Sequence, residues 1–170
     1  VYWIPGMRGT ELETAEGQRQ WGPWLQQSGE LPPDREVLAA DFSSMVAFDY
    51  LVGNWDRWSG ANVKTNADRS RLFVRDHNFT MRFPLSSRLQ ARVARYLQRV
   101  QRFSRSWVHS LRAMNEAVLR RELARGPMAS EMRALDEEAI VALLERREAL
   151  LSYVGSLVEG YGEEAVLCFP

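Results

Sequence analysis

The sequence has almost no cysteine, since Cys168 is the only one among 170 residues. A single thiol cannot form a disulfide within the chain, so nothing here requires an oxidising compartment. No run of apolar residues is long enough to span a bilayer. No secretory leader, with its basic and apolar regions, is visible at the start. We therefore expect no transmembrane segment and a cytoplasmic location.

Net charge is lacking as well, because 22 basic residues balance 22 acidic ones. A neutral chain has no general attraction to nucleic acid or to anionic membranes, so we expect no nucleic-acid partner.

Lysine is nearly absent, and Lys64 is the only one beside 21 arginines. This bias is typical of GC-rich codon usage, although the planar arginine fork also suits phosphate recognition.

The length and the ordinary hydrophobic content of 45% predict one globular domain over residues 1–170 with a sizeable core. Residues 1–33 are rich in aromatic residues, glycine and proline and have no helical period. They predict a short strand at residues 1–5, followed by irregular structure. Because Val1 is not an initiator methionine, we expect further sequence upstream.

Residues 34–84 predict a helix, a polar loop and a small hairpin. Pro32-Pro33-Asp34 is typical of a helix start, and Gly53-Asn54 of a helix end, so we expect a helix over 34–52. A polar loop follows over residues 53–62. Residues 62–65 and 72–74 then predict two short strands joined by a turn at residues 66–69.

Residues 85–170 predict helices. The first would begin at Leu85-Ser86-Ser87 and continue, with a kink, toward Leu123. Gly126-Pro127 breaks it, a short helical segment follows from Ser130 to Leu135, and a long helix starts at residue 136. The predicted fold class is therefore mainly α with a small β-hairpin.

The loop and the hairpin carry the residues with chemistry. A hairpin brings its two ends together, so Asp76, just after the second strand, should lie near Asn62, just before the first. Asp56 lies in the loop that ends at Asn62. Two carboxylates and an amide oxygen at one edge suit Mg²⁺ and a phosphate, which are the requirements of phosphoryl transfer.

Plainer interpretations stay open for these residues. Asp56 either takes part in chemistry or braces its loop, and Asp76 and Asn62 are either ligands or turn formers. Asp49 lies on an apolar helix, where a buried carboxylate needs partners. Arg57 pairs either with a phosphate or with Asp49, and we expect the structural pair.

The run Val46-Ala47-Phe48-Asp49-Tyr50-Leu51-Val52-Gly53-Asn54-Trp55-Asp56-Arg57 resembles the four-jointed and secreted Golgi casein kinase families. HipA-like kinases and type II phosphatidylinositol 4-kinases are similar in the Asn-x-Asp core. The run Leu72-Phe73-Val74-Arg75-Asp76-His77-Asn78 resembles the metal loop of these families. The resemblance covers residues 38–84 and implies a protein-kinase-like C-terminal lobe.

By this resemblance Asp56 is the catalytic aspartate, Asp76 is a metal ligand, and Asn62 contributes to cofactor and metal binding. It implies ATP and Mg²⁺ or Mn²⁺ as cofactors. The acceptor hydroxyl would belong to a protein, a sugar or a lipid headgroup. Asn62 follows Asp56 by six residues, where the families have five, and no glycine follows Asp76.

The motifs of an N-terminal lobe, a glycine-rich phosphate loop and a strand-borne lysine, are not found in the sequence. Such a lobe would lie upstream or in a partner chain. The alternative function is a pseudokinase or a helical protein-interaction module without catalysis.

For the remaining polar and aromatic residues we expect plain roles: His77 as a local hydrogen-bonding group, Trp55 and Trp58 in packing, and Lys64 in solvent.

Overall fold

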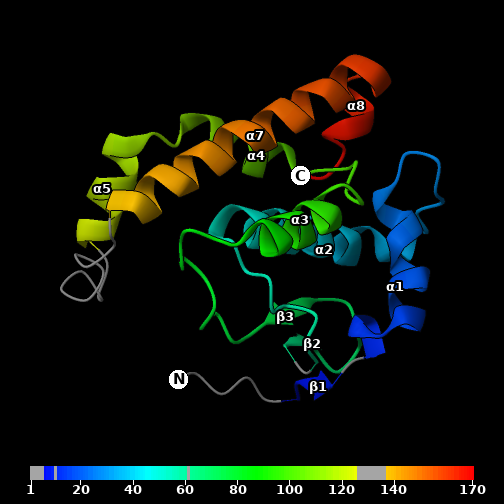
Figure 1. Ribbon diagram of the computed structural model, residues 1–170. Helices are drawn as coiled ribbons and strands as arrows, with labels where there is room; N and C mark the ends of the chain where they lie inside the picture. Colours follow the sequence, from blue (N-terminus) through cyan, green and yellow to red (C-terminus); the bar gives the residue numbers. More distant parts are fainter. Residues whose placement is uncertain (1–5, 10, 61, 126–136) are drawn as a thin grey trace.

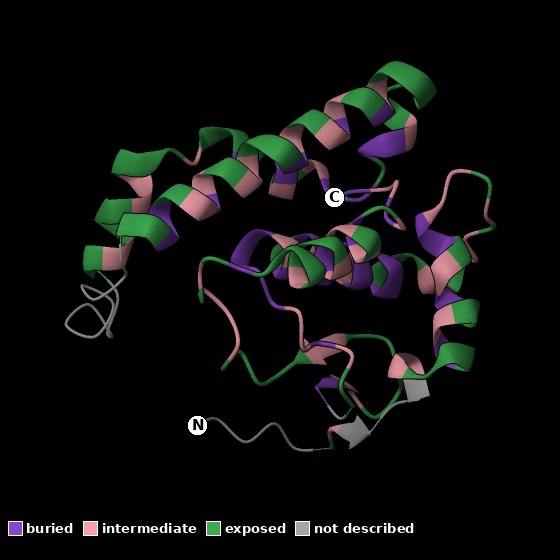
Figure 2. Ribbon diagram, in the orientation of Figure 1, coloured by how far each residue is buried: buried purple, intermediate pink, exposed green. Residues whose placement is uncertain are grey.

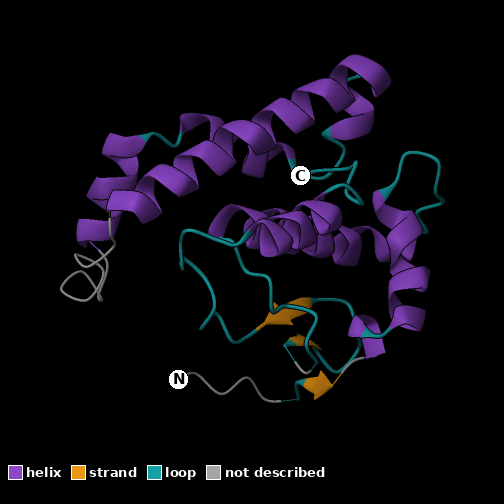
Figure 3. Cartoon of the chain, viewed as in Figure 1, coloured by secondary structure: helices purple, strands orange, loops and turns teal. Residues whose placement is uncertain are grey.

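The computed structural model describes residues 6–9, 11–60, 62–125 and 137–170. The chain is mainly helical with a small antiparallel sheet, as the sequence predicts (Figure 3). The elements are β1 (Arg8–Gly9), η1 (Glu11–Glu13), α1 (Ala15–Trp21), η2 (Gly22–Leu25), η3 (Pro33–Arg35), α2 (Glu36–Val52), β2 (Val63–Thr65), β3 (Leu72–Val74), α3 (Ser87–Leu97), α4 (Arg105–Ala113), α5 (Glu116–Arg125), α7 (Glu137–Tyr161) and α8 (Glu163–Val166).

Helix α2 lies at the centre of the molecule. It contacts α3, α7 and β3, so that the sheet lies on one side of it and the long helix α7 on the other (Figure 1). Most of its length is buried, and Phe42 is inaccessible to solvent (Figure 2). The small residues Ala39, Ser43 and Ala47 are also buried, which lets neighbouring elements approach closely. A helix that is covered on several sides is a fixed support for the loop at its end.

The ends of α2 agree closely with the sequence prediction. The short helix η3 leads into α2. Pro33 lies in the first turn of η3, where a backbone N–H would have no partner within the helix. Gly53 ends α2 in the left-handed conformation with φ 72°, and its N–H donates to the Asp49 and Tyr50 carbonyls. This turn reverses the chain into the polar loop.

The sheet has the strand order β1-β2-β3, and both pairs are antiparallel. The predicted hairpin is confirmed: Lys64 of β2 is opposite Phe73 of β3. At the turn, the Asn66 side-chain oxygen accepts hydrogen bonds from the backbone of Ser70 and Arg71, at 2.9 and 3.0 Å. The pairing of β1 with the free edge of β2 was not predicted, because a strand of two residues leaves no pattern.

The N-terminal segment is more regular than expected. The prediction of irregular structure was wrong for residues 15–25, which form α1 and η2. Thr14 caps α1, because its side chain accepts a hydrogen bond from the Gly17 N–H at 3.1 Å. Trp21, at the end of α1, stacks on Phe42 with ring centroids 4.5 Å apart. The predicted strand at residues 1–5 lies outside the described residues.

The predicted kinked helix over residues 85–123 is instead three helices, α3, α4 and α5. Between α3 and α4 the backbone donates to other segments: Gln101 N–H to the Leu25 carbonyl and Phe103 N–H to the Val166 carbonyl, both at 2.7 Å. These donors are not available to continue a helix. The predicted segment from Ser130 to Leu135 lies outside the described residues.

The predicted long C-terminal helix is confirmed as α7, which spans 25 residues. Its buried residues include Leu150 and Val154, which belong to the same core cluster as the buried residues of α2. None of the described helices is both long enough and apolar enough to cross a membrane.

Arginine side chains connect separate segments through backbone carbonyls. Arg102 donates to the Trp24 and Gly29 carbonyls at 2.8 and 3.0 Å, and Arg146 donates to the Tyr50 carbonyl at 2.9 Å. A guanidinium group has five N–H donors in a fixed plane and can reach several acceptors at once. This use of arginine recurs at the candidate site.

Candidate functional site

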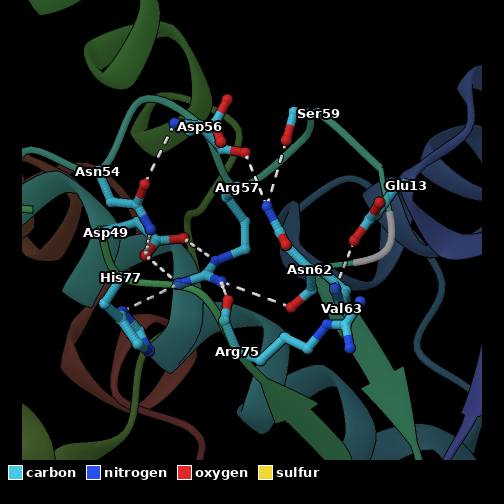
Figure 4. Close-up of polar contacts among 10 residues, drawn as sticks. All are labelled: Glu13, Asp49, Asn54, Asp56, Arg57, Ser59, Asn62, Val63, Arg75 and His77. Carbon is cyan, nitrogen blue, oxygen red and sulfur yellow. Dashed lines mark hydrogen bonds and ion pairs between the residues drawn. The ribbon is translucent and has the colours of Figure 1, made fainter. Parts of the chain in front are cut away.

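The site begins at the C-terminal end of α2. After the left-handed turn at Gly53, the Asn54 N–H donates to the Asp49 carbonyl at 2.8 Å. The buried Asn54 side chain then makes two bonds (Figure 4): its Nδ2 donates to Asp49 Oδ1 at 3.0 Å, and its Oδ1 accepts from the Asp56 N–H at 3.1 Å. Asn54 therefore fixes the start of the loop relative to the helix.

Asp49 and Arg57 form a buried, two-point ion pair. Arg57 Nε lies 2.8 Å from Asp49 Oδ2, and Nη2 lies 2.9 Å from Oδ1. Their side chains are 8% and 0% exposed. Burial raises the pKa of Asp49, while hydrogen bonds and charge from Arg57 oppose that rise. The expected structural pair is confirmed, and it offsets the cost of a carboxylate in the last turn of a helix.

Arg57 also contacts the loop after the hairpin. Its Nη1 donates to the Arg75 carbonyl at 2.7 Å and lies 3.5 Å from the Asn62 carbonyl. Its Nη2 lies 3.4 Å from Nδ1 of His77. Burial and the charge of Arg57 lower the pKa of His77, so a neutral ring can accept this hydrogen bond. One guanidinium thus touches three segments (Figure 4).

Asp56 is held through its backbone. Its N–H is bonded to Asn54, and its carbonyl accepts from Nδ2 of Asn62 at 3.3 Å. The residue is half-buried, and no described residue donates to its carboxylate; no dashed line reaches that carboxylate among the residues drawn in Figure 4. A carboxylate with a fixed backbone and no internal partner is suited to orient a bound molecule.

Asn62 is buried, and its orientation is fixed. Besides the Asp56 carbonyl, its Nδ2 reaches the Ser59 hydroxyl at 3.2 Å. No described residue donates to its side-chain oxygen, which leaves that atom available as a ligand. The Asn62 carbonyl accepts from the Arg75 N–H at 3.0 Å. This bond brings the residue before Asp76 beside Asn62, as the hairpin predicts.

Asp76 is exposed and has φ 59°, in the left-handed region. Its Oδ1 accepts from the Asn78 N–H at 3.2 Å. Positive φ is uncommon outside glycine, although aspartate tolerates it better than most residues.

The described residues contain no group of three or more His, Cys, Asp or Glu side chains that could hold a metal ion. A divalent ion at this site would depend on Asp76, the Asn62 oxygen and the phosphates of a substrate. Magnesium is commonly held in this way, by one or two side-chain oxygens with phosphates and water. These two side-chain oxygens would leave the remaining positions around such an ion to phosphate and water oxygens.

Sequence reasoning missed Glu13. Its carboxylate accepts a hydrogen bond from the Val63 N–H and so ties the N-terminal segment to the start of β2 (Figure 4). The two residues are 50 positions apart, and no local pattern predicts their contact. The packing role of Trp58 is confirmed, because its ring stacks on Trp21 and on Tyr96.

Backbone hydrogen bonds thus connect the loops that carry three candidate residues: Asp56, whose carboxylate has no partner among the described residues, the oriented amide of Asn62, and the exposed carboxylate of Asp76. Such a set can orient a hydroxyl group beside a metal-bound phosphate. No protein-family model, no curated protein and no solved structure matches the chain.

Proposed function

We propose that this chain is the catalytic C-terminal lobe of an ATP-dependent phosphotransferase, similar to the atypical four-jointed and secreted Golgi casein kinases. Asp56 orients the acceptor hydroxyl, and Asp76 and Asn62 hold Mg²⁺ or Mn²⁺. One observation carries the proposal. The Asp56 carboxylate has no partner among the described residues, while its backbone is bonded to Asn62, which is bonded in turn to the residue before Asp76.

In the proposed reaction, the acceptor oxygen forms a bond to the γ-phosphorus as the bond from that phosphorus to the bridging oxygen breaks. ADP leaves with the electron pair, and the hydroxyl proton passes to the Asp56 carboxylate. A bound divalent ion would neutralise phosphate charge. The acceptor is a hydroxyl group of a protein, a sugar or a lipid headgroup.

Further contacts to the nucleotide would come from an N-terminal lobe or a partner chain. Phosphoryl transfer needs cationic groups on the phosphates. Lys64 is the only lysine of the chain, and it lies in β2 opposite Phe73, inside the hairpin. In this proposal the chain supplies the residues for the acceptor and the metal, and the other lobe or chain supplies the cationic groups for the phosphates.

Calorimetric titration of Mn²⁺ and ATP into the protein tests the proposal. We expect saturable binding that Asp76→Ala weakens at least about tenfold, because a metal ligand is lost. Asp68→Ala is the matched control. Asp68 is an exposed aspartate of the same hairpin, and its carboxylate bonds only to Ser70 among the described residues. We expect this variant to bind like the unchanged protein.

The Asp56→Asn variant distinguishes nucleotide binding from phosphoryl transfer. It should leave nucleotide binding within about twofold and abolish phosphoryl transfer, because Asp56 acts on the acceptor. A folded protein that binds no Mn²⁺ and ATP would contradict the proposal. That result would favour the pseudokinase or protein-interaction function.

A further inference from the structure

Arg57 occupies an unusual position between the two loops of the site. It follows Asp56 directly in the chain, and its Nη1 donates to the Arg75 carbonyl at 2.7 Å. That carbonyl belongs to the peptide that joins Arg75 to Asp76. Arg57 thus adjoins Asp56 in the chain, and its guanidinium is hydrogen-bonded to the Arg75 carbonyl (Figure 4).

The side chain has little freedom to move. It is completely buried, and two of its nitrogens are held by the Asp49 carboxylate. Asp49 belongs to α2, most of whose described residues are buried. The third nitrogen, Nη1, faces the hairpin and contacts the carbonyls at both of its ends, Asn62 and Arg75. The geometry makes Arg57 a rigid connection between α2 and the base of the hairpin.

The conformation of Asp76 needs such a connection. A non-glycine residue with φ 59° is in a sparsely populated region and persists where its surroundings determine it. Arg75, the residue just before Asp76, is held at both of its backbone polar groups, since its carbonyl accepts from Arg57 and its N–H donates to the Asn62 carbonyl at 3.0 Å. The Arg57 contact therefore restricts the direction of the Asp76 carboxylate.

We propose that Arg57 is a positioning residue that couples the two loops, so that the placement of Asp76 for metal binding depends on the same guanidinium that braces the Asp56 loop. This inference rests on the proposed function for its metal readout. The coupling itself is a property of the protein without any ligand.

Arginine is required for this role because of its shape. Its planar fork can satisfy a carboxylate with two nitrogens and reach a carbonyl with the third. A lysine at position 57 would keep the charge and lose two of these three contacts. Arg57→Lys is therefore the informative substitution.

The chain provides a matched control in Arg71. Its Nε and Nη2 also hold an aspartate of α2, Asp41, at 2.9 and 3.2 Å, and so attach the residue before β3 to the same helix. The Arg71 side chain is 58% exposed, and among the described residues it bonds to Asp41 alone. Arg71→Lys removes a comparable fork and leaves both loops of the site intact.

The test is hydrogen–deuterium exchange on the full chain, read by mass spectrometry, for Arg57→Lys, Arg71→Lys and the unchanged protein. We expect Arg57→Lys to speed exchange about tenfold or more in residues 54–62 and in residues 74–78 together. Arg71→Lys should affect the hairpin and leave both of these loops unchanged. Loops that exchange as in the unchanged protein in Arg57→Lys would overturn the proposal.

A double variant tests the inference if Arg57→Lys fails to fold. Replacement of a buried ion pair by apolar residues of similar volume is often tolerated. We expect the double variant Asp49→Leu, Arg57→Met to unfold cooperatively and still to exchange faster in residues 74–78, because the Arg75 carbonyl has lost its donor. A well-folded double variant with normal exchange there would also overturn the inference.

The metal readout separates this inference from the proposed function. If the unchanged protein binds Mn²⁺ with ATP, Arg57→Lys should weaken that binding about 10- to 100-fold, as loss of a group supporting a ligand does. Faster exchange with unaltered affinity would refute the positioning role. If the unchanged protein binds no Mn²⁺ with ATP, the proposed function fails, and the exchange data alone decide whether Arg57 couples the loops.

Discussion

The indole of Trp58 stacks on the indole of Trp21, with ring centroids 5.4 Å apart and planes inclined by 17°. Trp21 stacks in turn on Phe42 of α2, and Trp58 on Tyr96 of α3, at 4.5 and 5.0 Å. The four rings form a continuous column. It fastens the loop of Asp56 to α1, α2 and α3.

Loss of one ring from the column should destabilise the protein. We expect Trp58→Ala to lower the free energy of unfolding by about 2–3 kcal/mol, because it removes both a large apolar surface and two ring contacts. Trp58→Phe keeps a ring in the column and should cost less than half as much. Urea denaturation measures both variants, and equal losses for the two would contradict a stacking contribution.

Gly53 should not tolerate a side chain. A Cβ there would lie 3.1 Å from Phe83 Cε1 and 3.2 Å from Leu85 Cδ1, and φ is 72°. We expect Gly53→Ala to cost about 1–3 kcal/mol from backbone strain and crowding. Gly155→Ala is the control, because Gly155 is inside α7 with nothing within 4 Å of a Cβ. It should stabilise the protein by about 0.5–1 kcal/mol, as thermal unfolding would show.

The reactivity of Cys168 should depend on folding. Solvent reaches this residue, yet partial burial raises the pKa of its thiol above the ordinary 9.0. We expect alkylation by iodoacetamide to reach half its maximal rate at a higher pH in the folded protein than in urea. Cys168 is the only cysteine, so no other thiol contributes.

The raised pKa of the Cys168 thiol also affects the stability of the protein. The folded state binds the thiol proton more tightly than the unfolded chain, so this group lowers the free energy of unfolding as pH rises above about 9 and has no effect well below it. Cys168→Ser should remove that component. The prediction would be contradicted if alkylation of the folded protein reached half its maximal rate at the same pH as in urea or at a lower one. That result would show that folding does not desolvate the thiol.

Tyr153 should contribute through its hydroxyl group. Its OH donates to the Val100 carbonyl at 2.9 Å, and burial raises the pKa of the phenol to about 12. We expect Tyr153→Phe to cost about 1 kcal/mol, because the Val100 carbonyl loses a donor. Tyr161→Phe is the control at an exposed position of the same helix and should be neutral. Chemical denaturation at pH 7 distinguishes the two.

The part of the fold that follows from local sequence was predictable. Proline begins the short helix η3 that leads into α2, glycine ends α2, and apolar residues are spaced along it. The hairpin is bounded by turn residues. The Asp49–Arg57 pair was also predictable. A buried carboxylate in the last turn of a helix needs a partner, and Arg57 is eight residues away in the loop that folds back over it.

The rest depends on contacts between distant segments. The bond from the Val63 N–H to Glu13 and the pairing of β1 with β2 link segments some 50 residues apart. Helix α1 contains Gly17 and is followed directly by Gly22-Pro23 of η2, and these residues conceal its helical period. The break between α3 and α4 is made by donors that turn to Leu25 and Val166, which no periodicity reveals.

The scarcity of lysine gives this site a built-in attachment point. Lys64 carries the only ε-amino group of the chain and lies in β2, two residues from Asn62 and opposite Phe73. Arginine makes the interior bonds to carbonyls and does not react with amine-selective reagents at neutral pH. Apart from the terminal amine, such a reagent would place a single fluorophore on the hairpin of the unaltered protein. A change in its emission when Mn²⁺ and ATP are added would indicate that they alter the surroundings of the hairpin.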